Sequence, residues 1–337
     1  MLHRSPLLAL GLLLAAACSG GDADAPDGEG PAADAPVADA AADQQVRTAD
    51  PYARGYTDDD FPRVQELAPG VYSYEQLRSA GEERFTTVSL FVVTDEGVLV
   101  ADGQGSLDET ERMIEAIAGI TDQPITDVVV ASDHGDHTAG NAAFPETARV
   151  YAHPTSAEAL RAMAGVAGAD APVRPATHLV EEREALTLGG RQIEILFLGR
   201  AHTGGDLVVH LPEEKILFMS EAYLHRIFPA MRTAHPSEWV EMIERAQSMD
   251  VDIYVPGHGF VDSPAILAEE LEVFQDAIRQ VNAEARRLHE AGVPLEEAQE
   301  QATFGDLESW SLRDSQGARA IQQVYAELNG ELAGASR

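Results

Sequence analysis

Cysteine, lysine and long hydrophobic segments are scarce in this chain of 337 residues. Cys18 is the only cysteine, so no intramolecular disulfide can form. Lys215 is the only lysine, and the formal net charge at pH 7 is −34. A protein this acidic repels the phosphate backbone of nucleic acids. We therefore expect a small-molecule substrate and no nucleic-acid partner.

Hydrophobic residues nevertheless make up 45% of the chain, which is enough for a sizeable core. After the N-terminal segment, no apolar run is long enough to cross a membrane. We therefore expect no membrane span beyond that segment.

The N-terminal residues 1–18 read MLHRSPLLALGLLLAAAC, an arginine followed by an apolar stretch and small residues. This pattern predicts a secretory signal peptide. Its end, Leu14 to Cys18, resembles the lipobox of bacterial lipoproteins, whose cysteine is acylated and becomes the new N-terminus. The alternative is an ordinary signal peptide that happens to contain a cysteine. We predict lipidation of Cys18, membrane contact through this anchor, and an extracytoplasmic domain in the periplasm.

Three further segments follow from composition and pattern. Residues 19–60 carry eleven acidic residues against two arginines and are rich in Ala, Gly and Pro, which predicts a disordered acidic linker. Residues 61–275 are predicted to form the main folded domain. Residues 276–337 are predicted to form a helical extension packed on that domain.

Strands and helices alternate over most of the folded part. Apolar or alternating runs predict strands at 70–74, 86–94, 97–101, 125–131, 148–152, 192–198, 207–211, 215–219 and 252–255. Helical spacing predicts helices at 107–119, 155–164, 236–248 and 263–289, and two shorter helices within 294–331. This order is typical of an α/β domain with large sheets inside and helices outside.

The most informative segment, ASDHGDHTAGN, begins at Ala131, where an apolar strand ends. It places Asp133, His134, Asp136 and His137 within five positions, beside glycines that allow a tight turn. Imidazole and carboxylate groups together suit zinc and similar divalent ions. A tight loop can aim neighbouring side chains at two points a few ångströms apart, which favours a two-metal site.

Three other predicted strands also end in a candidate ligand. His202 follows in GRAHTGGD, Glu221 follows Ser220, and His258 follows in PGHG. Ligands collected from several strand ends at one sheet edge are a common way to build an active site. The predicted metal ligands are His134, Asp136, His137, His202, Glu221 and His258.

The series SDHGDH, AHTGGD, SE and PGHG resembles the metallo-β-lactamase superfamily, nearest to its glyoxalase-II-like hydrolase branch. That family has H-x-H-x-D-H after a strand, then HTxG, then an acid or cysteine, then PGHG. The resemblance covers roughly residues 62–330. It implies an αβ/βα four-layer sandwich, the metallo-β-lactamase fold, with the metals at one edge of two sheets and here a C-terminal helical extension.

The resemblance also implies roles for single residues. His134 and His202 match ligands of the family's first metal. The ligands of its second metal are matched by Asp136, His137 and His258. Asp136 would also orient the attacking water and so act as the catalytic residue. The implied cofactor is zinc, as one or two ions, with other divalent metals possible.

One aspartate matches a supporting position of the family. Asp102, which follows the run VLVA, matches an aspartate that supports the metal site from near it. The alternative is an ordinary turn aspartate after a strand.

Two positions depart from the family pattern. Ser132 stands where the family has its first histidine, and Glu221 stands where it has an aspartate or cysteine. Serine is a poor zinc ligand, so the first site would rely on two imidazoles and be completed by water or Asp133. Glu221, with its longer reach, would complete the second site. We therefore expect the second site to bind metal more tightly, one ion to suffice, and Ser132→His to raise the metal content.

The function implied by the resemblance is hydrolysis of an ester, lactam, lactone or related substrate by a zinc-bound water or hydroxide. The alternative is a non-catalytic metal-binding or ligand-binding lipoprotein of the same fold. In the loop after Glu221, His225, Arg232 and His235 either help to bind the substrate or lie on the surface.

Overall fold

The computed structural model describes residues 46–164 and 174–332. These residues belong to one compact unit, Ala42–Arg337. Cys18, the predicted signal peptide and the linker up to residue 45 lie outside the described residues, so those assignments stay predictions. Within the described ranges, no helix has the length and apolar character needed to cross a membrane.

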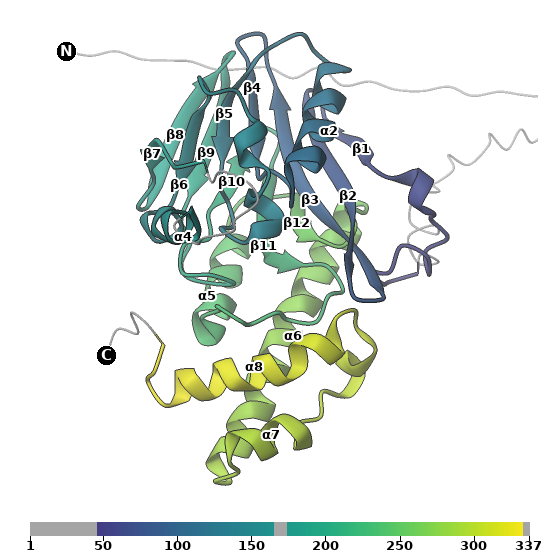
Figure 1. Cartoon of the computed structure of the whole chain (residues 1–337), viewed down its shortest axis with the longest axis vertical. Coiled ribbons are helices and arrows are strands. Elements are labelled where there is room, and N and C mark those ends of the chain that lie inside the picture. The colour runs from purple at the N-terminus through teal and green to yellow at the C-terminus, as the bar shows by residue number, and fades with distance from the viewer. Residues whose placement is uncertain (1–45, 165–173, 333–337) are drawn as a thin grey trace, which may run out of the picture. The chain divides into compact units, whose positions relative to one another are not determined.

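The strands form one twelve-stranded mixed sheet (Figure 1). The order is β7-β6-β5-β4-β3-β12-β11-β10-β9-β8, and β2 and β1 continue from β3. Strands β3 and β12 are registered through His258 and Thr87, and this seam divides the sheet into two halves. The bounds are β1 (Arg63–Ala68), β2 (Val71–Ala80), β3 (Glu83–Val93), β4 (Val98–Ala101), β5 (Ile125–Val129), β6 (Arg149–Ala152), β7 (His178–Leu179), β8 (Arg183–Leu188), β9 (Arg191–Leu196), β10 (Val208–Leu211), β11 (Ile216–Leu224) and β12 (Ile253–His258).

Strand β4 shows why the layers stack as they do. Val98 and Val100 join an apolar cluster with Met113 of helix α2 (Leu107–Ala118). Leu99 and Ala101 belong instead to the cluster that contains the apolar residues of β8 to β11. Because successive strand residues point to opposite faces, β4 is covered on both sides, which explains its uninterrupted apolar run.

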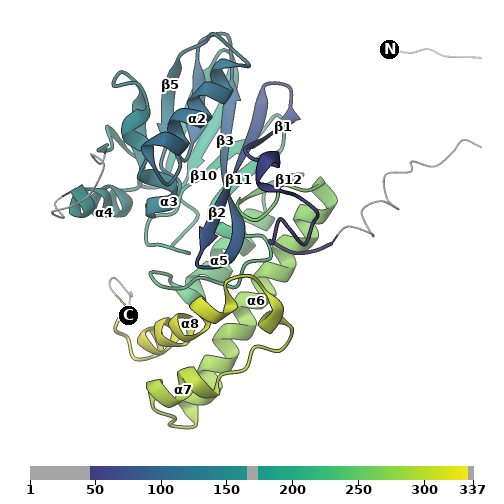
Figure 2. The same ribbon diagram turned by 45° about the vertical axis from the view of Figure 1, so that its right-hand side comes forward.

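The outer faces are covered by helices. Helix α2 packs on the half that contains β4 and β5, and α5 (Pro236–Gln247) and α6 (Pro264–Glu290) pack beside β11 and β12 (Figure 2). The Trp239 side chain of α5 donates a hydrogen bond to the Ala222 carbonyl of β11 at 2.9 Å. The short helices α3 (Gly135–Thr138) and α4 (Pro154–Ala164) follow β5 and β6. The predicted αβ/βα sandwich is confirmed.

The C-terminal part consists of α7 (Leu295–Gln301), the 3-10 helix η3 (Gly305–Ser309) and α8 (Arg313–Leu328). All of them are packed together near α6, at the lower end of the ribbon in Figure 1. The predicted short helices are therefore present. Helix α6 runs unbroken from Pro264 to Glu290, across residue 275, where the sequence placed the start of the extension.

The predicted end of the linker at residue 60 also differs from the structure. Ala49 is fully buried, Arg54 Nη1 lies 2.8 Å from Asp262 Oδ1, and the Tyr56 ring stacks on Phe260. Residues 46–60, which include the 3-10 helix η1 (Asp58–Asp60), are thus part of the folded unit. These contacts join segments about two hundred residues apart, so local composition gave no sign of them.

Strand β11 is longer than predicted. It does not end at residue 219 but continues to Leu224, and its register with β12 shifts between Phe218 and Ser220. Ser220 has φ 47, a left-handed conformation that bends the strand locally. Strands β1, β7 and β8 were not predicted, since β1 and β8 are short and partly exposed and β7 has only two residues.

Glu75 of β2 is a buried carboxyl group that supports a pH prediction. It lies 2.7 Å from Arg63 Nη1 and accepts a hydrogen bond from the Val261 N–H. Burial raises the pKa of Glu75 to about 7, although the Arg63 charge opposes the shift. The folded state therefore favours the protonated form, and this preference is complete below the unfolded pKa of about 4.3. It is lost as the pH rises through 7.

We expect Glu75→Gln to remove this loss. Relative to the wild type, the variant should gain free energy of unfolding between pH 5 and pH 8, measured by urea denaturation at each pH. The control is Glu111→Gln, which changes an exposed glutamate of α2. A difference between Glu75→Gln and wild type that stays the same at both pH values would contradict the prediction.

Candidate metal centre

Two groups of ligand side chains meet beside the seam between β3 and β12. The four-residue group consists of Asp136, His137, Glu221 and His258. The three-residue group consists of His134, His202 and Glu221. Within each group, one ligand atom from every residue lies within 4.8 Å of all the others. All six side chains singled out from the sequence as ligands therefore come together here.

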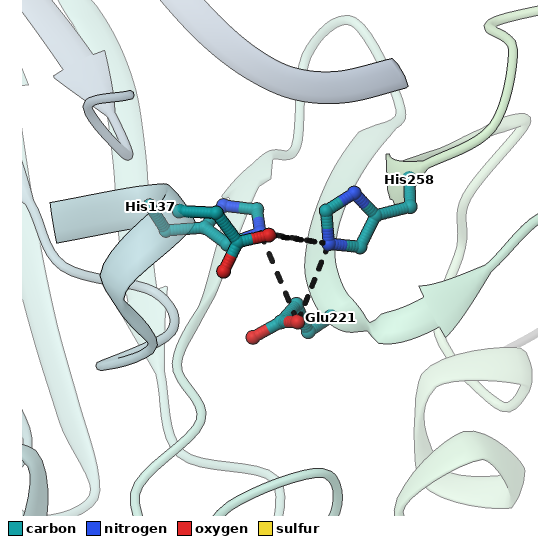
Figure 3. A group of neighbouring side chains, drawn as sticks. His137, Glu221 and His258 are labelled. Carbon is teal, nitrogen blue, oxygen red and sulfur yellow. Dashed lines mark hydrogen bonds and ion pairs between the residues drawn. The ribbon is translucent and has the colours of Figure 1, made fainter. Parts of the chain in front are cut away.

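The four-residue group is centred on His258 (Figure 3). Its Nε2 atom lies 3.2 Å from Asp136 Oδ2, 3.3 Å from His137 Nε2 and 3.3 Å from Glu221 Oε1. Bonds of 2.0–2.1 Å in a tetrahedral zinc site place neighbouring ligand atoms about 3.3 Å apart. The donor atoms and their spacing thus fit a divalent cation.

The ligand atoms of the three-residue group lie equally close to one another. His202 Nε2 lies 3.0 Å from His134 Nδ1 and 3.1 Å from Glu221 Oε1. The other carboxylate oxygen, Glu221 Oε2, lies 2.9 Å from His134 Nδ1. Glu221 is therefore shared between both groups, whereas the sequence assigned it to the second site alone.

Local backbone features set these positions. His134 precedes α3 as its N-cap residue, so the turn after β5 delivers His134, Asp136 and His137 together. Glu221 comes directly after the left-handed Ser220 in β11. On β12, Gly257 lies so close to Ser220 that an added Cβ would sit 2.3 Å from its carbonyl carbon. Only glycine permits this approach, which places His258 beside Glu221.

Hydrogen bonds behind the ligands fix two imidazole rings. The His258 Nδ1–H donates to the Thr86 carbonyl at 2.8 Å, which leaves Nε2 directed at the group. His137 Nδ1 lies 3.1 Å from Asp102 Oδ2, with the same effect on its Nε2. Such partners orient metal-binding histidines and raise their basicity.

Asp102 itself connects three segments. Its Oδ1 accepts hydrogen bonds from the backbone N–H of Ala131 and Ser132, and Ser220 Oγ donates to its Oδ2 at 2.5 Å. It is fully buried, at φ 62 directly after β4. Asp102 therefore lies behind His137 and holds the ligand-bearing turns together.

Ser132 is buried and donates a hydrogen bond from Oγ to Glu221 Oε2 at 2.5 Å. The two departures from the family pattern are thus in direct contact. A small side chain at 132 leaves space, and a longer one at 221 brings a carboxylate into it. Asp133 does not complete the first group as the sequence suggested, because it belongs to neither group of ligand side chains.

The charges of the site balance one another. Burial lowers the pKa of His258, but hydrogen bonds with Asp136 and Glu221 outweigh it and raise the pKa to about 10. Burial likewise lowers the pKa of His134, and Glu221 raises it to about 9. Burial raises the pKa of Glu221, yet the surrounding imidazoles, His202 first, hold it well below its usual value. A divalent cation would displace these imidazole protons, so its binding would release protons.

The loop after β11 contains residues of different kinds. His225 is fully buried and its Nδ1–H donates to the Phe260 carbonyl at 2.8 Å, so it has a structural role and does not lie on the surface. His235 is buried at the start of α5. Arg232 is exposed and lines a cavity of about 180 Å³ that opens on both ligand groups. Sequence reasoning missed Thr233, whose Oγ1 lies 2.9 Å from His134 Nε2.

Known proteins resemble this chain in sequence. The sequence model described as "Metallo-beta-lactamase superfamily" matches residues 83–258, more than half of the chain. The metallo-beta-lactamase type 2 of Bacillus sp. (strain 170) is 24% identical over 217 residues, covering 63% of this chain and 82% of that protein. The 2,4-dinitroanisole O-demethylase subunit alpha of Nocardioides sp. (strain JS1661) is 26% identical over 179 residues, covering 50% of this chain and 52% of that protein.

A solved structure agrees with the fold. The metallo-beta-lactamase from Pontibacter korlensis superposes with a TM-score of 0.56 at 22% identity, covering 64% of this chain and 99% of that chain. At this identity the likeness establishes the fold alone. Taken with the family match and the ligand groups, it leads to one conclusion: the chain belongs to the metallo-β-lactamase superfamily and is a metallo-hydrolase of that fold.

Proposed function

We propose that this protein hydrolyses an ester, lactam, lactone or related small molecule with divalent metal, preferably zinc, held by the two ligand groups. The observation that carries the proposal is the pair of histidine and carboxylate groups, joined by Glu221, that face one cavity. The ligand atoms are nitrogen and oxygen without sulfur, which suits zinc and several other divalent ions.

The metal would activate the water, and the protein would orient it. Bound zinc acts as a Lewis acid and lowers the pKa of a coordinated water to about 7. Asp136 is the only carboxylate of the four-residue group with substantial exposure, 26% of its side chain. It lines the cavity beside His258, where it is suited to orient the attacking water and to accept its proton.

The groups differ in the number of ligands they offer. The four-residue group provides four side chains, and the three-residue group provides three, with Glu221 common to both. We propose that the four-residue group binds its ion more tightly and that a second ion binds with lower affinity. Because Glu221 is shared, its loss should weaken both.

We also propose that the protein is anchored outside the cytoplasm through a lipid on Cys18. The support is the signal-like segment 1–18 and its lipobox-like end. Such an anchor would hold the hydrolase at a membrane surface, where its substrate arrives as a small molecule.

Metal removal tests the function. After dialysis against a chelator, zinc should restore hydrolysis of a 4-nitrophenyl ester or a chromogenic β-lactam, and mass spectrometry should count up to two ions per chain. Glu221→Gln should lower zinc affinity at least about tenfold. The matched control is Glu241→Gln on the exposed face of α5.

Two outcomes would count against the proposal. Zinc binding without any chelator-sensitive hydrolysis would favour the non-catalytic metal-binding alternative. Equal zinc affinity in Glu221→Gln and Glu241→Gln would show that the Glu221 carboxylate is not a metal ligand shared by the two groups.

The contact between Ser132 and Glu221 gives a second prediction. An imidazole at 132 would need the space that the Glu221 side chain fills. Ser132→His alone should therefore weaken zinc binding, about tenfold, and not raise the metal content as the sequence suggested. The double variant Ser132→His/Glu221→Asp should recover most of this loss, because the shorter acid makes room.

Competition with a chelating dye would measure the zinc affinities, and thermal melting of each variant would show that it folds. A double-mutant cycle on the free energy of zinc binding should therefore show a large positive coupling between positions 132 and 221. If the losses of zinc affinity in the two single variants simply added up in the double variant, the two positions would not compensate for one another.

The anchor can be tested by fractionation. With Cys18→Ser the protein should leave the membrane fraction and become extractable by aqueous buffer, because the acceptor sulfur for acylation is gone. The matched control is Ser19→Cys/Cys18→Ser, which moves the cysteine by one position. Wild-type protein found only in the aqueous fraction would argue against the lipid.

A further inference from the structure

The cavity beside the ligand groups has a second chemical character. Its lining includes ligand side chains and also four apolar side chains, Phe85, Leu224, Ile227 and Leu312, all of which are buried. Two arginines, Arg232 and Arg319, complete the lining and are exposed. The lining thus combines candidate metal ligands, apolar side chains and positive charge.

Helix α8 supplies part of this lining. Gln316 and Arg319, three positions apart on α8, line the cavity, and so does Leu312, the N-cap residue of the helix. Residues with this spacing share one face of a helix. The face of α8 that is turned to the cavity therefore contains an amide and a guanidinium, and the N-cap residue adds an apolar side chain.

Helix α8 is fastened to the loop that follows Glu221. The Phe228 N–H donates to the Ser311 carbonyl at 2.9 Å, and Gln323 Nε2 donates to the Ala234 carbonyl at 2.7 Å. The next residue after Ser311, Leu312, donates its N–H to Glu83 Oε1 at 2.7 Å. These bonds hold Arg319 in place relative to the loop of Arg232.

The same loop is tied to the metal ligands. Thr233 Oγ1 lies 2.9 Å from His134 Nε2 and donates to the His202 carbonyl at 3.2 Å. Its neighbour Arg232 lines the same cavity as His134 and His202. One guanidinium is therefore held next to the three-residue group, and the other stands on α8.

Neither guanidinium forms a direct ion pair or hydrogen bond within the described part of the chain, although the Arg232 charge acts on the Asp133 carboxylate. Among the described residues, no ion pair or hydrogen bond joins Arg232 or Arg319 to another side chain or to the backbone. Other exposed arginines, such as Arg183, Arg245 and Arg279, do contact carboxylates. In a chain with 57 acidic and 23 basic residues, two free guanidinium groups on one cavity are available to an anion from outside.

We propose, building on the hydrolase function above, that the substrate is a small ester whose apolar segment ends in an anionic group. The ester bond faces the ligand groups, the apolar segment packs against Phe85, Ile227 and Leu312, and the anion binds Arg232 and Arg319. Guanidinium groups form short, strong hydrogen bonds with carboxylate and similar anions.

The reaction consumes one water molecule. The water oxygen forms a bond to the acyl carbon, and the bond between this carbon and the alcohol oxygen breaks. The alcohol leaves with one proton, and the new carboxylate releases the other. No redox partner is needed.

The overall charge makes the inference specific. A net charge of −34 repels anions at long range. Salt largely screens that repulsion beyond about 8 Å at physiological ionic strength, whereas the two guanidinium groups act at contact distance. A preference for anions must therefore come from a local site and not from the general surface.

The test uses two esters that differ only at the distal end. Mono-4-nitrophenyl glutarate has a terminal carboxylate where 4-nitrophenyl valerate has a methyl group. The zinc-loaded protein should show a kcat/KM at least about tenfold higher for the glutarate ester, since a hydrogen bond to a charged group contributes a factor of about 10 to 100. Arg232→Gln and Arg319→Gln should each lower this ratio, and Arg286→Gln, an exposed control on α6, should leave it as in the wild type.

A binding measurement separates this inference from the hydrolase function. Titration calorimetry on metal-depleted protein would compare glutaranilate with the neutral valeranilide, neither of which requires hydrolysis. Tighter binding of glutaranilate that is lost in the Arg232→Gln/Arg319→Gln variant supports the anion site, even if neither ester is cleaved. Equal binding of both compounds, or a preference that survives in the double variant, overturns the anion site, even if both esters are cleaved.

Discussion

The structure of the site depends on one shared carboxylate. Glu221 contacts ligand histidines of both groups, and its second oxygen accepts the hydrogen bond from Ser132. Removing a buried carboxylate from among several imidazoles would leave their positive charge unbalanced. The bulge at Ser220, the close approach of Gly257 and the turn held by Asp102 all converge on this side chain. The backbone is locally unusual at the place where the ligands must meet.

The seam between the two half-sheets has a chemical as well as an architectural role. His258 is the β12 residue registered with β3, and its ring is fixed by the Thr86 carbonyl of that strand. The same residue is the centre of the four-residue group. The way the halves are joined and the direction of a ligand nitrogen are therefore set by the same contacts. A shift of either half would move a ligand.

The sequence was informative wherever the signal was local. The buried strands around residues 97–101 and 125–129 stand out as short apolar runs, and α5 and α6 were predicted to within one residue at each end. The ligand residues were found because each follows or ends a strand predicted from the sequence, although β11 continues past Glu221 to Leu224. Glu221's place in both groups depends on the register shift at Ser220, which no local pattern reveals. The packing of Arg54 on Asp262 and the contribution of α8 to the cavity rest on contacts between distant segments.

The position of α8 has a consequence for how such an enzyme diversifies. The ligands lie within residues 83–258, where the family model matches, whereas Leu312, Gln316 and Arg319 lie beyond them. Exchanges at these positions of α8 and its N-cap alter the cavity lining while every ligand and its supporting hydrogen bonds stay in place. Substitutions in this helix can thus change which substrates the cavity accepts, independently of the residues that carry out the hydrolysis.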